Sequence, residues 1–182
     1  MSPADGNNLG GTLIPELAQF SNLAVLDLQN HDETGRIQGR LPSELGLLPL
    51  GGIFLQGNQL TGTIPKELCR VTGLKYLELN KNSMTGTIPN CLASLTELRR
   101  LVLTSNSFSG SIPSQFGQLD LLDELRLEFN NLSGSVPVEI WDATRIGVGL
   151  ELMVDGCVEV YGGRLDCSVP NCQCDCPDCG SN

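Results

Sequence analysis

The fold is decided by the stretch Leu74-Lys75-Tyr76-Leu77-Glu78-Leu79-Asn80-Lys81-Asn82-Ser83-Met84-Thr85-Gly86-Thr87-Ile88-Pro89. It reads L-x-x-L-x-L-x-x-N-x-(L/M)-x-G-x-I-P, and its marker residues recur every 24 positions. The recurring columns are Asn58, Asn82, Asn106 and Asn130; Gly62, Gly86, Gly110 and Gly134; and Pro65, Pro89, Pro113 and Pro137. A fixed period of this length predicts a solenoid, in which each repeat buries its apolar side against its neighbours.

Each repeat opens with a short predicted strand. Strands are expected around residues 53–55, 77–79, 101–103 and 125–127. Because side chains alternate along a strand, the outer members of each triplet point inward and the middle one points out. After the strand, the Asn amide is expected to bond backbone groups left over at the bend. The Gly then permits a positive φ, and the Pro fixes the entry to the next segment.

A third segment follows each proline. Its apolar residues recur at intervals of three, which predicts a short helix or 3₁₀ turn packed on the core. The sets are Leu68, Val71 and Leu74; Leu92, Leu95 and Leu98; and Phe116, Leu119 and Leu122.

The period breaks at both ends of the chain. Residues 7–15 hold half a repeat, which indicates either a piece of a larger parent chain or a cap of unusual kind. The return path after Leu28 is four residues longer than in later repeats, so we expect a loop within residues 29–36, often a binding feature. Residues 146–156 read as a degenerate last strand. We therefore expect a repeat domain over residues 1–156 and a Cys-rich C-terminal cap over residues 157–182.

The repeat pattern resembles the plant-specific class of leucine-rich repeats, which includes receptor-kinase ectodomains and polygalacturonase-inhibiting proteins. The resemblance covers residues 7–145. It implies an α/β right-handed leucine-rich-repeat solenoid of about six turns, with a parallel sheet on the concave side, short convex helical or 3₁₀ segments, and ligand contacts on the concave face. The tail after Gly163 departs from the plant cap and is similar to Cys-rich tails of secreted microalgal repeat proteins.

Eight cysteines, an even number, favour disulfides and an oxidising compartment, so we expect a secreted or lumenal protein. Cys69 and Cys91 lie in adjacent convex segments, where they form a fourth bridge unless their two-residue offset stretches the Cα separation past about 7 Å. The remaining candidates form the C-terminal cluster: Cys157, Cys167, Cys172, Cys174, Cys176 and Cys179. A zinc site is the alternative for this cluster, but its C-x-C spacings are a poor zinc signature.

Charge and composition exclude several function classes. The net charge of −10 makes a nucleic-acid partner a poor expectation, because phosphate binding needs a positive surface. The sequence has no apolar run of about 18 residues that would span a membrane, and no signal peptide is visible at Met1. His31 has no Ser or Cys nucleophile motif beside it, and open strand positions do not tune carboxylates such as Asp123. We expect no enzyme, no metal and no cofactor.

The outward positions of the predicted concave sheet are the candidate ligand-binding residues. They are Val25, Asp27, Phe54, Gln56, Tyr76, Glu78, Asn80, Arg100, Val102, Arg126 and Glu128. Exposed aromatics beside mixed charge favour a protein or peptide ligand. The alternative is that neighbouring strands simply pair their charges, Arg100 with Glu78 or with Glu124.

A second surface offers a different function. The Thr-Gly-Thr and Ser-Gly-Ser triplets at 61–63, 85–87, 109–111 and 133–135 are expected to stack in register, one turn above the next. Such a ladder of hydroxyls could match a polysaccharide or an ice-like surface. A third possibility is a structural component of a cell wall or assembly. Asn131 begins the sequon Asn131-Leu132-Ser133 and should be exposed for N-glycosylation.

Overall fold

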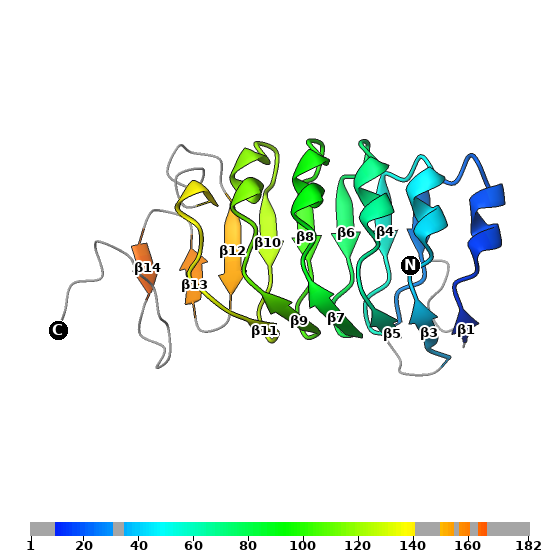
Figure 1. Cartoon of the computed structure of the whole chain (residues 1–182), viewed down its shortest axis with the longest axis horizontal. Helices are drawn as coiled ribbons and strands as arrows, with labels where there is room; N and C mark the ends of the chain where they lie inside the picture. The colour runs from blue at the N-terminus through cyan, green and yellow to red at the C-terminus, as the bar shows by residue number, and fades with distance from the viewer. Residues whose placement is uncertain (1–9, 31–34, 141–149, 155–156, 161–163, 167–182) are drawn as a thin grey trace.

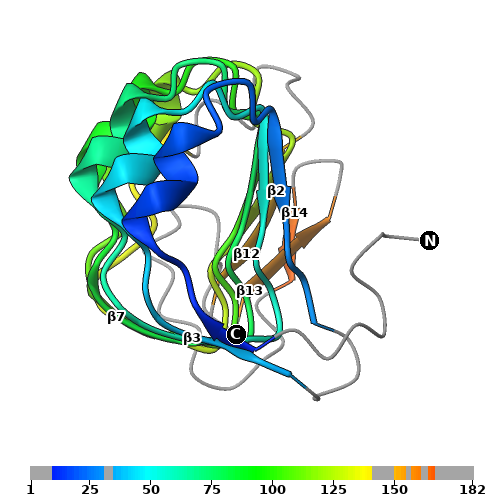
Figure 2. The ribbon, with the colours of Figure 1, turned by 90° about the vertical axis from the view of Figure 1, so that its right-hand side faces the viewer.

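The computed structural model describes residues 10–30, 35–140 and 150–154 in full, and residues 157–160 and 164–166 as backbone strands. The described chain coils as a solenoid, so the predicted leucine-rich-repeat fold is confirmed. Viewed along the coil, each turn has three sides: one strand of a first sheet, one strand of a second sheet and a short 3₁₀ helix (Figure 2). Successive turns stack side by side along the molecule (Figure 1).

The first sheet holds the predicted L-x-L strands. Its strands are β2 (Val25–Asp27), β4 (Gly52–Phe54), β6 (Tyr76–Glu78), β8 (Arg100–Val102), β10 (Glu124–Arg126), β12 (Glu151–Val154), β13 (Cys157–Val160) and β14 (Arg164–Asp166). The strands from β2 to β12 pair in parallel, as predicted. The pairings of β13 with β12 and of β14 with β13 are antiparallel, and both of these strands lie after residue 156. The division between a repeat domain and a cap at residue 156 stays a prediction.

The second sheet contains the corner that follows each Asn. Its strands are β1 (Gly11–Thr12), β3 (Ile37–Arg40), β5 (Gln59–Gly62), β7 (Ser83–Thr87), β9 (Ser107–Gly110) and β11 (Asn131–Leu132). The 3₁₀ helices close each turn on the third side: η1 (Pro15–Gln19), η2 (Ser43–Leu47), η3 (Lys66–Arg70), η4 (Asn90–Ser94) and η5 (Ser114–Gln118). From η2 to η5 the residue before each helix is a proline in extended conformation, which confirms its role at the entry.

The Asn column works as predicted. The Asn82 Nδ2 group donates to Leu55 O and Leu79 O, both at 2.9 Å, and Asn82 Oδ1 accepts from Leu60 N at 2.9 Å. One amide therefore joins the strand ends of two turns to the second sheet of the earlier turn. Asn58, Asn106 and Asn130 repeat this arrangement. Gly62, Gly86, Gly110 and Gly134 all have the positive φ expected at the next corner.

The core is a stack of aliphatic rows. Leu26, Ile53, Leu77, Leu101, Leu125 and Leu152 are register partners across the first sheet, and all are buried. The predicted apolar sets after Pro65, Pro89 and Pro113 are buried on the opposite side, as expected. Each turn thus fills the same volume with similar side chains, and the burial of this apolar surface holds the coil together.

The two sheets stack with different registers. In the first sheet, Tyr76 pairs with Arg100, an offset equal to the 24-residue period. In the second sheet, Thr87 pairs with Ser109 and Thr61 with Ser83, so the second sheet is sheared by two residues per turn. Equivalent residues of the Thr-Gly-Thr triplets consequently do not lie opposite one another, and the expected in-register hydroxyl ladder is wrong. The reason is that the second strand of each turn runs obliquely to the stacking direction.

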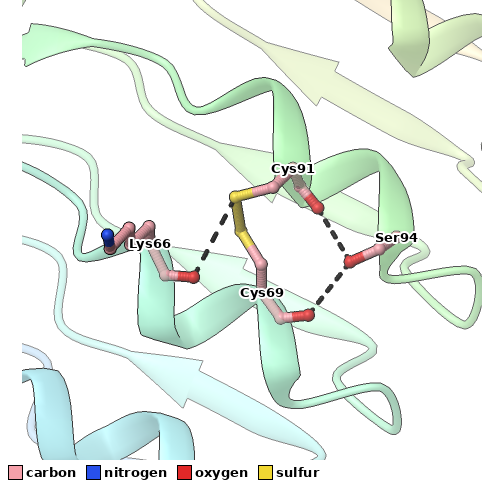
Figure 3. Close-up of a disulfide and its surroundings, with 4 residues drawn as sticks. All are labelled: Lys66, Cys69, Cys91 and Ser94. Atoms are coloured by element: carbon pink, nitrogen blue, oxygen red, sulfur yellow. Dashed lines mark hydrogen bonds between the residues drawn. A yellow bond between two sulfur atoms is a disulfide. The ribbon is translucent and has the colours of Figure 1, made fainter.

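The same shear explains the disulfide of the helical layer. Cys69 and Cys91 are bonded, with their Cα atoms 5.7 Å apart (Figure 3). Adjacent helices are staggered, and the two-residue offset between Cys69 and Cys91 matches this stagger. The offset therefore shortens the Cα separation, where the sequence left open that it would lengthen it. The stagger recurs where a Cβ added to Gly117 would lie 2.5 Å from Glu139 O. Beside the disulfide, the Ser94 hydroxyl donates either to Cys69 O of the neighbouring helix, at 3.0 Å, or to Cys91 O of its own helix, at 2.8 Å. The side chains of the six C-terminal cysteines lie outside the described residues.

Candidate functional site

The candidate site is the outer face of the first sheet, here called the first-sheet face. Three positions per turn reach it: the first residue of the three-residue strand, its last residue, which forms the middle column, and the residue two positions after that. For the third turn these are Tyr76, Glu78 and Asn80. Backbone bonds continue the ladder beyond the strands, because Gly57 N donates to Asn80 O and Lys81 N donates to Thr104 O, both at 2.9 Å. The predicted site residues therefore form three columns that run across the turns.

The N-terminal part of the face is apolar and aromatic. Phe54 and Tyr76 stack with their ring centroids 6.0 Å apart and an interplanar angle of 27°. Gly52, which pairs with both Val25 and Tyr76, leaves room for the Phe54 ring, because a Cβ there would lie 2.7 Å from Phe54 Cε2. Val25 remains 51% exposed and Tyr76 37% exposed. These four residues are called the aromatic patch below.

The C-terminal part of the face is occupied by paired charges. Arg100 binds Glu78 (Arg100 Nη1 to Glu78 Oε1, 3.0 Å) and also binds Glu124. Arg126 binds Glu124 and, at 2.9 Å, Glu151. The hydrogen bond to Glu78 is the main cause of a raised pKa of the Arg100 guanidinium, which partial burial opposes. Both charge pairings proposed from the sequence are thus present, and the two arginines are engaged within the sheet.

Val102 does not have the exposure predicted for it. It lies in the middle column but is only 8% exposed. Its register partners are Glu78 on one side and Arg126 on the other, and their longer, ion-paired side chains flank it. Val102 therefore adds to the packing of the sheet and, unlike Val25 and Tyr76, is not available as an apolar contact for a ligand.

A pocket lies beside the aromatic patch, where the turn with the long loop, residues 23–42, meets the sheet. It has a volume of about 390 Å³ and is lined by Asn30, Arg36, Gln56, Gly57, Glu78, Asn80 and Lys81. Gln56, Glu78 and Asn80 are brought together here as the sequence predicted. Of the predicted loop, Asn30 and Arg36 line the pocket, and residues 31–34, including His31, lie outside the described residues.

Lys81 is a lining residue that sequence reasoning missed. It follows the outward position Asn80 and has a φ of 55°, as do Ser105 and Phe129 at the equivalent places with φ of 57° and 58°. The equivalent residue of the second turn is Gly57, with φ of 76°. Gly57 was the available signal in the sequence, since a glycine at this place of the repeat marks a left-handed backbone conformation.

The hydroxyl surface on the second sheet is exposed but partly engaged. Thr61 donates to Gly39 O at 3.2 Å and Thr85 to Gly62 O at 3.4 Å, so these hydroxyls bond the preceding turn. Thr63 and Thr87 are exposed, and their methyl groups lie over the Gly of the next turn. Asn131 is exposed, as its predicted role requires, and its glycosylation stays a prediction. Among the described residues, no group of three His, Cys, Asp or Glu side chains is placed to hold a metal ion.

Comparisons with known proteins agree with this architecture. A family model described as a leucine rich repeat matches residues 49–108 and 72–132. The Protein STRUBBELIG-RECEPTOR FAMILY 1 of Arabidopsis thaliana is 37% identical over 70 residues, which cover 38% of this chain and 8% of that protein. The chain is a leucine-rich-repeat protein of the plant type. It therefore has a recognition fold, and it spans less than a tenth of the length of this curated relative.

Solved structures of two kinds share the fold of this leucine-rich-repeat protein. The Arabidopsis receptor kinase HAESA, in complex with the peptide hormone IDA and the co-receptor SERK1, is 31% identical with a TM-score of 0.70, covering 80% of this chain and 24% of that one. A plant ice-binding protein is 30% identical with a TM-score of 0.64, covering 72% of this chain and 42% of that one. In the described part of the chain, no helix is long and apolar enough to cross a membrane.

Proposed function

We propose that this protein is an extracellular recognition module that binds a protein or peptide on its first-sheet face, through the aromatic patch and the adjoining pocket. The carrying observation is the asymmetry of that face. Both arginines of its C-terminal part are ion-paired within the sheet, whereas Tyr76 and Val25 stay exposed beside a pocket of about 390 Å³. Exposed aromatic side chains next to polar groups are the composition favoured at binding hot spots.

The relatives support this proposal in kind. HAESA is a plant receptor kinase whose leucine-rich-repeat chain was solved with a peptide hormone and a co-receptor. The Cys69–Cys91 disulfide supports an oxidising, extracellular location, because such bonds persist outside the reducing cytosol. Within the proposal, Phe54 and Tyr76 anchor an apolar side chain of the ligand, and Gln56 and Asn80 bond its backbone.

Capture of ligands from the extracellular fraction of the source organism tests this proposal. The immobilised protein is compared with Tyr76→Ser and Phe54→Ser variants, and bound peptides and proteins are identified by mass spectrometry. The matched control is Leu47→Ser, which removes an apolar side chain that is 68% exposed on the helical layer. We expect a specific ligand to be lost with Tyr76→Ser and Phe54→Ser and retained with Leu47→Ser. Equal retention by all of the proteins would refute binding at the aromatic patch.

Binding of an ice-like or polysaccharide surface is a second candidate, favoured by the exposed Thr63 and Thr87 and by the likeness to a plant ice-binding protein. A groove of about 760 Å³ beside these hydroxyls runs over three turns, from Thr87 through Ser111 to Ser135. Under this second candidate, the protein should shape ice, and the double variant Thr63→Lys with Thr87→Lys should not. The shear of the second sheet weighs against it, and an absence of ice shaping by the unaltered protein would exclude ice binding.

A further inference from the structure

A row of side-chain oxygens without hydrogen-bond donors crosses the first-sheet face. The atoms are Gln56 Oε1, Asn80 Oδ1, Thr104 Oγ1 and Glu128 Oε2, and each is buried with no partner among the described residues. The four residues are spaced by the repeat period and occupy the same place in successive turns. We call them the acceptor row.

Backbone hydrogen bonds hold the acceptor row in place. Gly57 N donates to Asn80 O, Lys81 N to Thr104 O, and Ser105 N to Glu128 O, at 2.9, 2.9 and 3.0 Å. The four residues therefore stand side by side on neighbouring strand ends, about 4.8 Å apart. Each residue as a whole is only half-buried, so part of each side chain is accessible from the solvent side of the sheet.

The direction of the Gln56 amide is fixed by a chain of hydrogen bonds that begins at a carboxylate. Asp27 Oδ2 accepts from Gln29 Nε2 at 3.3 Å, and Gln29 Oε1 accepts from Gln56 Nε2 at 2.6 Å. Because an ionised carboxylate only accepts, neither amide can be reversed without placing two acceptors together. The Gln56 oxygen is consequently the open end of the chain, and it requires a donor from outside.

The far end of the row is also a carboxylate. Glu128 makes no ion pair within the described residues, whereas Arg100 and Arg126 on the neighbouring strands bind Glu78, Glu124 and Glu151. The two arginines of these strands are therefore committed elsewhere, and Lys81 lines the pocket near the other end of the row. An incoming positive charge would find at Glu128 a carboxylate without a cation and, one strand away, the Thr104 hydroxyl.

We propose that the acceptor row binds a lysine-bearing segment of the ligand, with the ammonium group between Thr104 and Glu128 and ligand backbone N–H groups on Gln56 and Asn80. This inference rests on the proposed function, because it names the chemistry of the ligand at the same face. Thr104 and Glu128 lie on neighbouring strand ends, about 4.8 Å apart. An ammonium group has three N–H donors, so one lysine can bond both side chains.

Net charge favours a positively charged ligand, and coordination geometry favours a lysine over a metal ion. The protein carries a net charge of −10, which favours the approach of a basic segment. A calcium ion takes about six to eight oxygens around it, and a row on one face of a sheet offers them only from one side. An unpartnered buried oxygen raises the free energy of the unliganded protein, so a donor that reaches the row is favoured.

The test uses fluorescein-labelled hexalysine, its fully acetylated counterpart and hexaglutamate, with binding followed by fluorescence anisotropy. Thr104→Val removes one acceptor without changing charge, and Thr96→Val is its exposed control on another face. Glu128→Gln removes one carboxylate, and Glu97→Gln is the control with the same change of net charge. Circular dichroism checks that each variant is folded.

We expect saturable binding of hexalysine and a loss of at least about tenfold on acetylation. Thr104→Val and Glu128→Gln are each expected to weaken binding at least about tenfold, since they remove bonds to a charged donor. The two control variants should change it less than twofold. Equal effects within each pair would show general attraction to an acidic protein and overturn the proposal, as would the absence of saturable binding up to 1 mM.

The ligand-capture experiment separates this inference from the proposed function. If an extracellular ligand depends on Tyr76 but is retained by Thr104→Val and Glu128→Gln, the proposed function stands and the acceptor row has no part in binding. If hexalysine binding depends on Thr104 and Glu128 while no captured ligand depends on Tyr76, the acceptor row stands and the aromatic anchor fails.

Discussion

Replacing Asn82 by alanine should destabilise the protein far more than replacing Asn80, although the two side chains are alike and two residues apart. Asn82 bonds Leu55 O, Leu79 O and Leu60 N at 2.9 Å, so its loss leaves Leu60 N without its acceptor. Leu55 O and Leu79 O each lose one of two donors, because they also accept from Asn58 and Asn106. Asn80 has a side-chain oxygen without a donor, so its removal breaks no recorded bond there.

The magnitude follows from one group left unpaired and two further bonds lost. Leaving Leu60 N unpaired costs about 1–3 kcal/mol and each of the other two bonds about 0.5–1.5 kcal/mol, which gives a range of about 2–6 kcal/mol. Asn82 is half-buried, and water can reach part of the opened corner, so we expect the low end of that range, about 2–3 kcal/mol. For Asn80→Ala we expect a change within about 0.5 kcal/mol.

Urea unfolding followed by far-ultraviolet circular dichroism measures both variants beside the unaltered protein, with disulfides kept oxidised. The free energy of unfolding is taken from the midpoint and slope, and the slopes must agree for the comparison to hold. If Asn82→Ala and Asn80→Ala differ by less than about 1 kcal/mol, the account of the Asn column as the link between turns is refuted.

Three further predictions concern other parts of the coil. The double variant Cys69→Ala with Cys91→Ala should lose about 3 kcal/mol of unfolding free energy, the value for a loop of 22 residues, and an unchanged urea midpoint would contradict this. Gly57→Ala should lower the free energy of unfolding by about 2 kcal/mol or more, because φ is 76° and the new Cβ would overlap Asn30 O. Phe129→Gly should raise it by about 0.5 kcal/mol, since Phe129 is 71% exposed at φ 58°. Thermal melts that rank the two variants in the opposite order would refute this reading. Arg100→Met should cost about 1 kcal/mol at low salt and less in 1 M NaCl, because the charge network is half-exposed. The raised pKa of Arg100 makes its contribution fully present below the pKa of the unfolded state and lost only as pH rises through the folded value, so this difference should stay constant between about pH 6 and 9; a steep change in that window would contradict it.

Several features of the site lay within reach of the sequence, and others did not. The alternation around Leu77 and Leu79 placed Tyr76, Glu78 and Asn80 on one face, because a strand's side chains follow its own backbone. The burial of Val102 was out of reach, since it depends on how Glu78 and Arg126 of two other turns lie beside it. The same holds for the pocket, which joins Lys81 of one turn to Arg36 two turns earlier.

The sequence by itself determined the repeat: its period, the Asn bond at each bend, the positive φ of Gly62 and its equivalents, and the buried aliphatic rows. These features depend only on a residue and on its equivalents in the adjacent turns, and the period of the sequence already identifies those equivalents. Only the tertiary structure decided the shear between turns. A shear of two residues brought Cys69 against Cys91 and displaced the threonines from register, because the tilt of one segment relative to the stacking direction is set by the packing of the whole turn and leaves no mark in the period.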